Sequence, residues 1–312
     1  MSTSVLITGA TGYLGGRLCQ FLAAPGGFRV RMATRRAADN LPDWAGAFEH
    51  VRLDLESDES LDVACRDIDV IIHLAAVNAQ EAAADPARAD EVNVGGTERL
   101  IAAAARAGVK RAVYVSTIHV YGAPLQGTID ETTPPRPAHP YASTHLAAEN
   151  IVLTEPGLTG VVLRLSNSLG APADATANCW MLVANDLCRQ AVREKQIQLA
   201  GDGSGVRDFV CMSDVLRALA HVARLPTADL GERLFNVGAG SSISIRDLAQ
   251  RVAERTEQIF SYRPPVITGP PSGVSVEPLS YLSQRIAATG FRYQGDLDRE
   301  LDETLRFCAE TP

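Results

Sequence analysis

The glycine spacing near the start of the chain is the feature that most constrains its fold. Gly9, Gly12 and Gly15 lie three residues apart, after an apolar run over Val5–Thr8 and before a helical pattern over Leu14–Ala24. Glycines permit a tight turn and a close approach to the backbone, and helix N-termini bind anions. This context predicts a turn that binds the pyrophosphate of a dinucleotide, although a tight turn without a ligand has the same pattern. The residues expected to contact the cofactor here are Gly9, Thr11, Gly12, Tyr13, Leu14 and Gly15.

Short apolar runs alternate with helical patterns through the first half of the chain. The expected strands are Val5–Thr8, Arg29–Thr34, Val51–Leu55, Val70–Ala75, Ala112–Ser116 and Val161–Leu165. A helix is expected over Glu91–Ala107, with Gly108 at its end. This alternation predicts an α/β fold with a doubly wound parallel sheet and helices on both faces. Ligands of such sheets bind at the carboxyl ends of the strands.

The regular alternation of apolar runs and helical patterns ends after Leu165. Helical patterns cover Met181–Glu194, Ser213–Ala223 and Ser244–Glu257, a short strand is expected over Ile197–Leu199, and prolines from Pro264 to Pro278 indicate an irregular region. We therefore predict a dinucleotide-binding domain over residues 1–166. Residues 167–312 are expected to form mostly a smaller substrate-binding domain, with some segments returning to the first.

Composition excludes several classes of protein. The formal net charge of −8 disfavours nucleic-acid binding, which needs a cationic face, and no apolar stretch has membrane-spanning length. The first residues lack the basic start and apolar core of a signal peptide, so we expect a cytoplasmic protein. The six cysteines are scattered without a Cys-x-x-Cys pair, which favours reduced thiols over a metal site.

The end of the second expected strand bears on the choice of cofactor. An acidic residue at this place would bind the ribose 2′-hydroxyl of NAD, but the chain has Thr34-Arg35-Arg36. Two cations suit a 2′-phosphate, so NADP is slightly preferred over NAD; a solvated basic loop is the alternative. Asp54 and Leu55, at the end of the third expected strand, are expected near the adenine.

Several motifs in order resemble the extended short-chain dehydrogenase/reductase family, the NAD(P)-dependent epimerase/dehydratase group. Besides the glycine turn they are Ile72–Ala76, Asn93–Thr97, Val115–Thr117 with Val120–Gly122, Pro140-Tyr141, Leu163–Asn167, Arg207–Val210 with Asp214-Val215, and Asn236–Gly238. The resemblance covers nearly the whole chain. It implies a Rossmann domain, a nucleotide-sugar substrate and a homodimer. It also implies cofactor contacts at Leu74, Ala75, Ala76 and Asn93, and a substrate contact at Asn167.

The same resemblance implies the catalytic residues. Hydride transfer to or from the cofactor requires the protein to move a proton on or off the reacting oxygen. In the family a tyrosine does this beside a Ser or Thr hydroxyl that holds the oxygen, and these positions fall on Tyr141 and Thr117, with Ser116 as the second choice. By itself, Tyr141 also fits an amphipathic tyrosine at the start of a helix.

His145 is a departure from the family pattern, which has Tyr-x-x-x-Lys. Residues 141 and 145 lie on one face of a helix. The usual lysine holds the nicotinamide ribose and lowers the tyrosine pKa by its charge. A histidine, often neutral at pH 7, can still bond a ribose hydroxyl but activates Tyr141 less, or only when protonated. A weakened or lost active site is the alternative.

Two further departures narrow the substrate and the reaction. Relatives commonly carry an arginine before Pro-Gly-Asp, whereas Gly269–Gly273 holds no cation, so Arg207 and Arg263 are left for phosphate contacts. Ordinary surface salt bridges are the alternative, favoured for Arg263 and less so for Arg207. Relatives that are dehydratases have Asp-Glu after the catalytic threonine, whereas this chain has Ile118-His119. Ile118 cannot transfer protons, which disfavours dehydration.

These features together predict an NAD(P)-dependent enzyme that acts on a sugar carbon, C4, of a nucleotide-activated sugar, as an epimerase or a ketoreductase. Two alternatives stay open. One is a dinucleotide-binding sensor without catalysis, because His145 replaces the lysine. The other is a reductase of a carbonyl compound that is not a sugar nucleotide, because the C-terminal arginine is missing. No metal is expected, because His73 and His119 lack further ligands at suitable spacing.

Overall fold

The computed structural model describes residues 2–24, 27–271 and 277–311. The chain divides into two compact units. Unit 1 comprises residues 1–124, 133–164 and 216–235, and unit 2 comprises residues 125–132, 165–215 and 236–312. The unit changes at residue 165, and residues 216–235 belong to unit 1. The expected functional division after residue 166 stays a prediction. The assignment of residues 167–312 to substrate binding stays a prediction.

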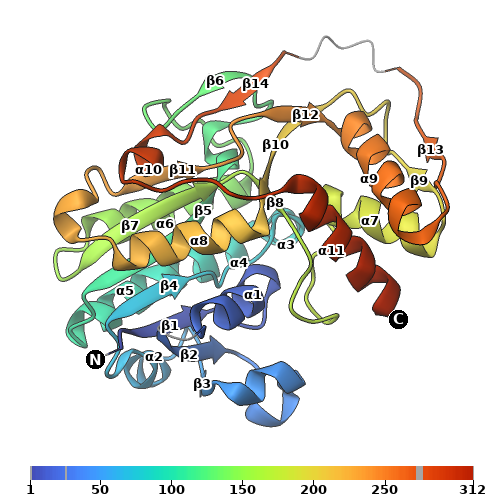
Figure 1. Cartoon of the computed structure of the whole chain (residues 1–312). Helices are drawn as coiled ribbons and strands as arrows, with labels where there is room; N and C mark the ends of the chain where they lie inside the picture. Colours follow the sequence, from blue (N-terminus) through green and yellow to red (C-terminus); the bar gives the residue numbers. More distant parts are fainter. Residues whose placement is uncertain (1, 25–26, 272–276, 312) are drawn as a thin grey trace. The chain divides into compact units, whose positions relative to one another are not determined.

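A seven-stranded sheet, built mainly by unit 1, confirms the predicted doubly wound α/β fold (Figure 1). The strand order is β11-β7-β5-β4-β1-β2-β3, and the pairs β1–β2, β2–β3, β1–β4 and β4–β5 are parallel. After β3 the chain crosses back to place β4 on the other side of β1. This reversal makes the carboxyl ends of β1 and β4 the switch point at which such sheets bind ligands. The strands are β1 (Ser4–Thr8), β2 (Arg29–Thr34), β3 (Glu49–Arg52), β4 (Val70–His73), β5 (Arg111–Thr117), β7 (Thr159–Leu165) and β11 (Leu234–Val237).

Helices cover both faces of this sheet. On one face α2 (Asp58–Cys65), α5 (Gly96–Arg106) and α6 (Pro140–Thr154) bury Leu and Ala side chains against the strands. On the opposite face lie α1 (Tyr13–Leu22) and α8 (Met212–Arg224) (Figure 1). All residues of β1 and β4 are buried, as expected of strands covered on both sides.

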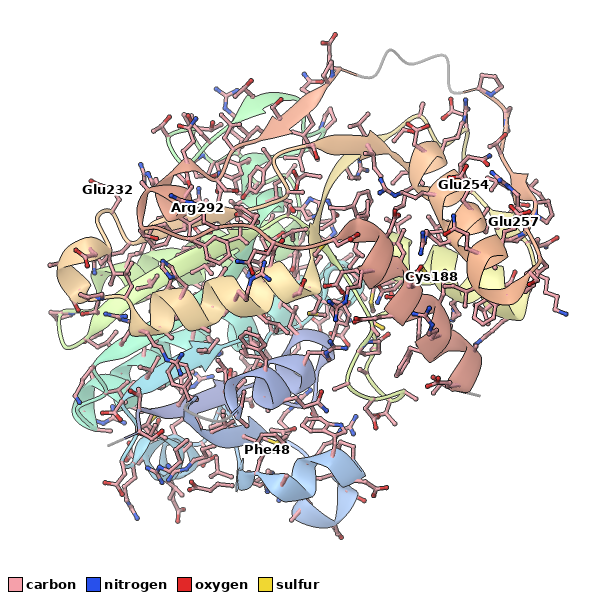
Figure 2. The ribbon with its side chains drawn as sticks, in the orientation of Figure 1. Phe48, Cys188, Glu232, Glu254, Glu257 and Arg292 are labelled. Carbon is pink, nitrogen blue, oxygen red and sulfur yellow. The ribbon has the colours of Figure 1, made fainter. Side chains whose placement is uncertain are left out.

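Unit 2 has small sheets and a helical core. Its sheets are β12-β10-β8, β13-β9 and β14-β6, and its largest helices are α7 (Val183–Arg193), α9 (Ile245–Phe260) and α11 (Leu297–Glu310). The three helices share a core with Leu187, Leu248 and Leu301, and Cys188, labelled in Figure 2, is fully buried on α7. The strands are β6 (Gly127–Ile129), β8 (Asn167–Leu169), β9 (Ile197–Gln198), β10 (Val206–Cys211), β12 (Ser242–Ser244), β13 (Val266–Ile267) and β14 (Leu279–Tyr281).

The short helices complete the chain. They are α3 (Ala79–Ala84), α4 (Pro86–Ala89), α10 (Gln284–Ala288), the 3-10 helices η1 (Ala38–Asn40), η2 (Asp43–Ala47), η4 (Ile118–Tyr121) and η5 (Thr227–Asp229), and the π-helix η3 (Asp90–Gly95). Within the described ranges, no helix has both the length and the apolar character needed to cross a membrane.

Several elements have other bounds than the apolar pattern predicts, and the third strand, expected over Val51–Leu55, covers Glu49–Arg52 instead. The strand expected over Val70–Ala75 stops at His73, because the N–H groups of Leu74 and Ala75 donate to the Thr8 hydroxyl instead of continuing the sheet. The helix expected over Glu91–Ala107 begins with the π-helix η3 and becomes α-helical only at Gly96. Such π-segments are rare and occur often at functional sites.

Candidate active site

The glycine turn between β1 and α1 is closed by contacts that exclude side chains. Gly9 has φ +65°, and a Cβ there would lie 3.0 Å from the Ala75 nitrogen. A Cβ on Gly15 would overlap the Gly9 carbonyl oxygen. At Gly12, among the described residues outside its own stretch of chain, such a Cβ would have the Gly9 carbonyl oxygen as its neighbour within 4 Å, at 3.1 Å. Gly9 and Gly15 are therefore required by the turn itself, whereas Gly12 leaves room that a ligand can use.

The first turn of α1 fits an anion. Its N-cap, Gly12, offers no side-chain cap, and the turn contains no acidic residue. The first N–H groups of a helix lack intrahelical partners and lie at the positive end of its dipole. Thr11 fixes the turn beside β2 through a 3.1 Å hydrogen bond between its hydroxyl and that of Thr34. These residues of the turn thus fit the pyrophosphate of a dinucleotide.

His73, at the end of β4, is a buried structural histidine. The Thr97 hydroxyl donates to the Asn93 carbonyl, so it accepts from His73 Nε2 at 3.1 Å. The Thr8 hydroxyl then donates to His73 Nδ1 at 2.6 Å. Burial lowers the pKa of His73 to about 4, so the ring is neutral at pH 7. Both ring nitrogens are used to join β1, β4 and α5.

Asn93, on the π-helix, is buried and links the segment after β4 to α6. Its side-chain oxygen accepts from Val77 N at 2.9 Å, and its amide nitrogen donates to the Thr144 hydroxyl at 3.0 Å. Thr144 in turn donates to the Tyr141 carbonyl. A direct contact of Asn93 with the cofactor stays a prediction.

Tyr141 lies in the first turn of α6, beside the end of β5. The His139 side chain caps this helix by accepting from Tyr141 N at 3.1 Å. Burial raises the pKa of the Tyr141 phenol, and a hydrogen bond with the Thr117 side chain opposes that rise. The structure thus brings together Thr117 and Tyr141, the pair expected from the sequence.

Ser116 belongs to a different group of side chains. Its hydroxyl donates to Glu149 at 2.5 Å, and Glu149 also accepts from Arg164 in a bidentate ion pair whose side chains are 1% and 4% exposed. Neither member of this buried pair is among the site residues predicted from the sequence. Tyr141, His145 and Glu149 recur every four residues, and that spacing was the signal that could have placed Glu149 on their face of α6.

His145 is 4% exposed and packs edge-on against Tyr141, with ring centroids 4.4 Å apart. Its Nδ1 lies 2.7 Å from the Tyr114 hydroxyl, and its Nε2 is buried without a hydrogen-bond partner. Burial, followed by the neighbouring His73 and His119, lowers the pKa of His145 to about 3. The ring is therefore neutral at pH 7 and supplies no charge to Tyr141.

The residues expected near the adenosine lie after β2 and β3. Arg35 is exposed and Arg36 half-buried. The Asp54 carboxylate accepts from Glu56 N at 3.0 Å, while Leu55 packs against Gly96 at the start of α5. Both pairs of residues follow carboxyl ends of strands, and their contacts with a cofactor stay predictions.

The residues expected to bind substrate lie in unit 2. The Asn167 side chain donates to the Asp208 carbonyl at 2.9 Å, and Arg207 donates to the Val206 carbonyl at 2.8 Å. Arg263 forms ion pairs with Glu254 and Glu257, both labelled in Figure 2, at 3.1 and 3.3 Å. These are the surface pairs that the sequence offered as the alternative for Arg263. In the stretch Gly269–Gly273, Ser272 and Gly273 lie outside the described residues.

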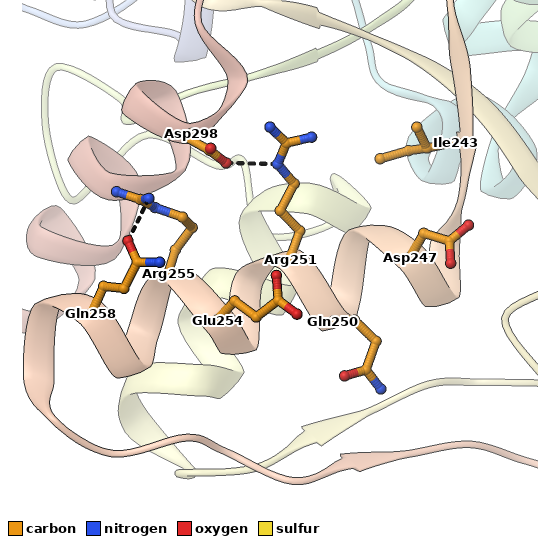
Figure 3. A pocket seen from close by; sticks show the side chains of 8 residues that line it. All are labelled: Ile243, Asp247, Gln250, Arg251, Glu254, Arg255, Gln258 and Asp298. Atoms are coloured by element: carbon orange, nitrogen blue, oxygen red, sulfur yellow. Dashed lines mark hydrogen bonds and ion pairs between the residues drawn. The ribbon is translucent and has the colours of Figure 1, made fainter.

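A pocket of about 430 Å³ lies on unit 2, over α9 and the start of α11 (Figure 3). Its cations are already engaged, because Arg251 pairs with Asp298 and Arg255 with Asp302, both at 2.6 Å. Of the described residues, no three His, Cys, Asp or Glu side chains form a group that could hold a metal ion.

The doubly wound sheet and its glycine turn define a Rossmann-type dinucleotide-binding protein. Residues 5–238 match the model of the NAD dependent epimerase/dehydratase family, and the chain belongs to that family. The resemblance read from the motifs is thereby confirmed.

Similar proteins include both reaction types of the family name. The chain is 31% identical over 279 residues to a UDP-glucose 4-epimerase of Azospirillum brasilense. This match covers 81% of this chain and 77% of the relative. The chain is 29% identical over 269 residues to a dTDP-glucose 4,6-dehydratase of Streptomyces griseus, covering 81% and 79%. A solved structure of the Thermus thermophilus UDP-glucose 4-epimerase complexed with NAD is similar with a TM-score of 0.81 and 26% identity, covering 99% and 100%.

Proposed function

We propose that this protein is an enzyme that uses a nicotinamide dinucleotide to oxidise or reduce C4 of the sugar in a nucleotide-activated sugar. The family membership and the nucleotide-sugar relatives support the substrate class. The observation that carries the proposal is the buried pair of Tyr141 and Thr117, hydrogen-bonded beside the switch-point edge of the sheet. The family's chemistry needs a proton donor beside an oxygen-binding hydroxyl, and this pair would supply both.

The glycine turn would bind the cofactor's pyrophosphate through the N–H groups of α1. Gly12 leaves room for it, because no side chain fills that place. At the end of β2, Arg35 and Arg36 would bind a 2′-phosphate, so we propose NADP ahead of NAD. When bound, the nicotinamide supplies or accepts the hydride.

Tyr141 would move the proton on the reacting oxygen, and Thr117 would hold that oxygen. Thr117 is preferred to Ser116 because the Ser116 hydroxyl already donates to buried Glu149. Asn167 and Arg207 remain the proposed substrate contacts in unit 2. A dimer of two identical chains in the cytoplasm completes the proposal, by analogy with the family.

The protonation state of Tyr141 favours reduction. Burial raises the pKa of Tyr141, and His145 beside it is neutral, so the phenol keeps its proton at pH 7. A protonated phenol can donate to the alkoxide that forms when a ketone is reduced, whereas oxidation of a hydroxyl needs a base first. We therefore place the ketoreductase ahead of the epimerase. Dehydration fits poorly, because buried Ile118 follows Thr117 and cannot exchange protons.

Mass spectrometry of the purified protein tests the proposal directly. We expect a nicotinamide dinucleotide or a sugar nucleotide to co-purify with the protein. In an activity assay, we expect NADPH to be consumed when a 4-keto nucleotide sugar is supplied. Turnover of a carbonyl compound without the nucleotide would overturn the substrate class while keeping the oxidoreductase chemistry.

A non-catalytic dinucleotide sensor is the second candidate. It is favoured by the neutral state of His145, which offers Tyr141 no cation. Tight dinucleotide binding, with no turnover of any nucleotide sugar in either direction, would make it the better reading.

A further inference from the structure

Tyr114 and His145 form a buried pair that the sequence motifs do not account for. Tyr114, on β5, is 2% exposed, and its hydroxyl lies 2.7 Å from His145 Nδ1 on α6. The two rings are tilted against each other, with centroids 5.7 Å apart. The Tyr114 hydroxyl thus holds the ring of His145 through this hydrogen bond. A lysine at position 145 would not need such a partner.

The direction of this hydrogen bond follows from the protons available. Burial raises the pKa of the Tyr114 phenol well above its usual value, so the hydroxyl keeps its proton. Within the described part of the chain, the bond to His145 is the hydrogen bond that this hydroxyl makes. Tyr114 therefore donates, and Nδ1 accepts with its lone pair. A neutral imidazole whose Nδ1 is an acceptor carries its proton on Nε2.

The other ring nitrogen, His145 Nε2, differs from Nδ1 in its surroundings. It is buried and has no hydrogen-bond partner in the described structure. The titratable groups that face the ring are Tyr114, Tyr141, His73 and His119, none of which is a carboxylate. Buried donors are nearly always satisfied, and an exception calls for an explanation such as a ligand. His73 differs, because hydroxyl groups engage both of its nitrogens.

We propose that Tyr114 is a positioning residue that fixes His145 as the neutral tautomer with its proton on Nε2, and that this N–H binds a hydroxyl of the nicotinamide ribose. The second half rests on the proposed function, whereas the first half does not. The family's lysine gives that position a charge together with a donor. Here the chain keeps the donor and gives up the charge.

Nitrogen-15 NMR of histidine-labelled, cofactor-free protein at pH 7 tests the first half. Protonated and bare ring nitrogens resonate far apart, and the spectrum of a His145→Gln variant identifies the signals of His145 among the six histidines. We expect a bare Nδ1 and a protonated Nε2 in the wild type. In Tyr114→Phe, which keeps the ring, we expect a mixture of both tautomers.

Tyr262→Phe is the matched control, because it also removes a hydroxyl that makes one 2.7 Å hydrogen bond, to the Ala191 carbonyl. It should leave the His145 signals unchanged. A proton on Nδ1 in the wild type, a cationic ring at pH 7, or unchanged His145 signals in Tyr114→Phe would each overturn the role of Tyr114.

Titration with NADP and NAD tests the second half. Binding should shift the His145 Nε2 signal, and Tyr114→Phe should weaken the affinity about fivefold, as loss of one fixed donor would. Binding that leaves this signal unmoved would overturn the ribose contact alone. Failure of both dinucleotides to bind would overturn the proposed function and the ribose contact, while the tautomer result would stand.

Discussion

At the glycine turn after β1, the structure requires residues without side chains. A Cβ on Gly9 or Gly15 would press on neighbouring backbone atoms, and the φ of Gly9 is one that other residues rarely adopt. Along one face of α6 the structure requires particular functional groups instead, those of Tyr141, His145 and Glu149. The turn follows the family pattern residue by residue, whereas α6 departs from it at position 145.

This contrast teaches where a chain can change its chemistry. Where a side chain would clash with backbone atoms, only glycine fits, so the turn admits little variation in sequence. A requirement for a hydrogen-bond donor has several answers, and a histidine provides one if a partner fixes its proton. Variants in the two regions can test this contrast.

Tyr141→Phe should lower the turnover number by about 10²- to 10⁴-fold, the usual contribution of a positioned acid or base. Dinucleotide affinity should change little, because the phenol acts on the substrate oxygen. Steady-state kinetics with the substrate and calorimetry with the cofactor measure both, and Tyr262→Phe serves as the control. A variant with nearly full turnover would remove Tyr141 from the mechanism.

Gly12→Val should weaken dinucleotide binding at least about 100-fold, which corresponds to about 3 kcal/mol. The side chain would occupy the place of the pyrophosphate, while its Cβ meets only the Gly9 carbonyl oxygen at 3.1 Å. The fold should survive, as circular dichroism can show. Gly46→Val is the control, since among the described residues beyond its chain neighbours nothing lies within 4 Å of a Cβ there. Wild-type affinity in Gly12→Val would refute the assignment of the turn.

His145→Lys should place a cation beside Tyr141 and lower the pKa of its phenol by about 1 to 3 units. The limb of the pH–rate profile that reports loss of the Tyr141 proton should move to lower pH by that amount. His145→Gln, which keeps a neutral donor, should leave this limb in place. If the lysine variant and the wild type have the same profile, position 145 does not influence Tyr141.

Acid should destabilise the protein through its two buried histidines. The pKa values are about 4 for folded His73 and about 3 for folded His145, against about 6.5 in an unfolded chain. Between pH 6.5 and 4 the unfolded chain therefore binds protons that the folded chain does not, and stability falls as pH falls. Each histidine contributes up to about 1.4 kcal/mol per pH unit.

Urea unfolding across that pH window measures this effect. Replacing His73 or His145 by Gln should each reduce the slope of the free energy of unfolding against pH. An unchanged slope in His145→Gln would mean that the ring is not neutral in the folded protein.

Replacing Arg35 and Arg36 together by Ala should weaken NADP binding about tenfold more than NAD binding, because charge-assisted contacts to a 2′-phosphate are lost. Calorimetry with both cofactors decides this. An equal loss for the two cofactors, or a wild-type preference for NAD, would show that these arginines play no part in cofactor choice.

Much of the fold could be predicted because its signals are local. Apolar runs marked β1, β2 and β5 within one or two residues, and the order of the motifs indicated the family. The ends of β4 and the π-helix at Asp90–Gly95 could not be predicted, because they depend on a hydroxyl of Thr8 and on packing against α6. The helix α11 was missed outright, since the prolines before it suggested an irregular region.

By itself the sequence determined the glycine turn, the doubly wound sheet and the family, because backbone sterics and apolar periodicity act between near neighbours in the chain. Only the tertiary structure decided that Thr117 faces Tyr141 while Ser116 serves the Glu149–Arg164 pair. It also decided the state of His145, whose partner Tyr114 lies 31 residues away. The protonation state of a side chain depends on burial and on partners brought together by folding, and residue spacing does not contain that information.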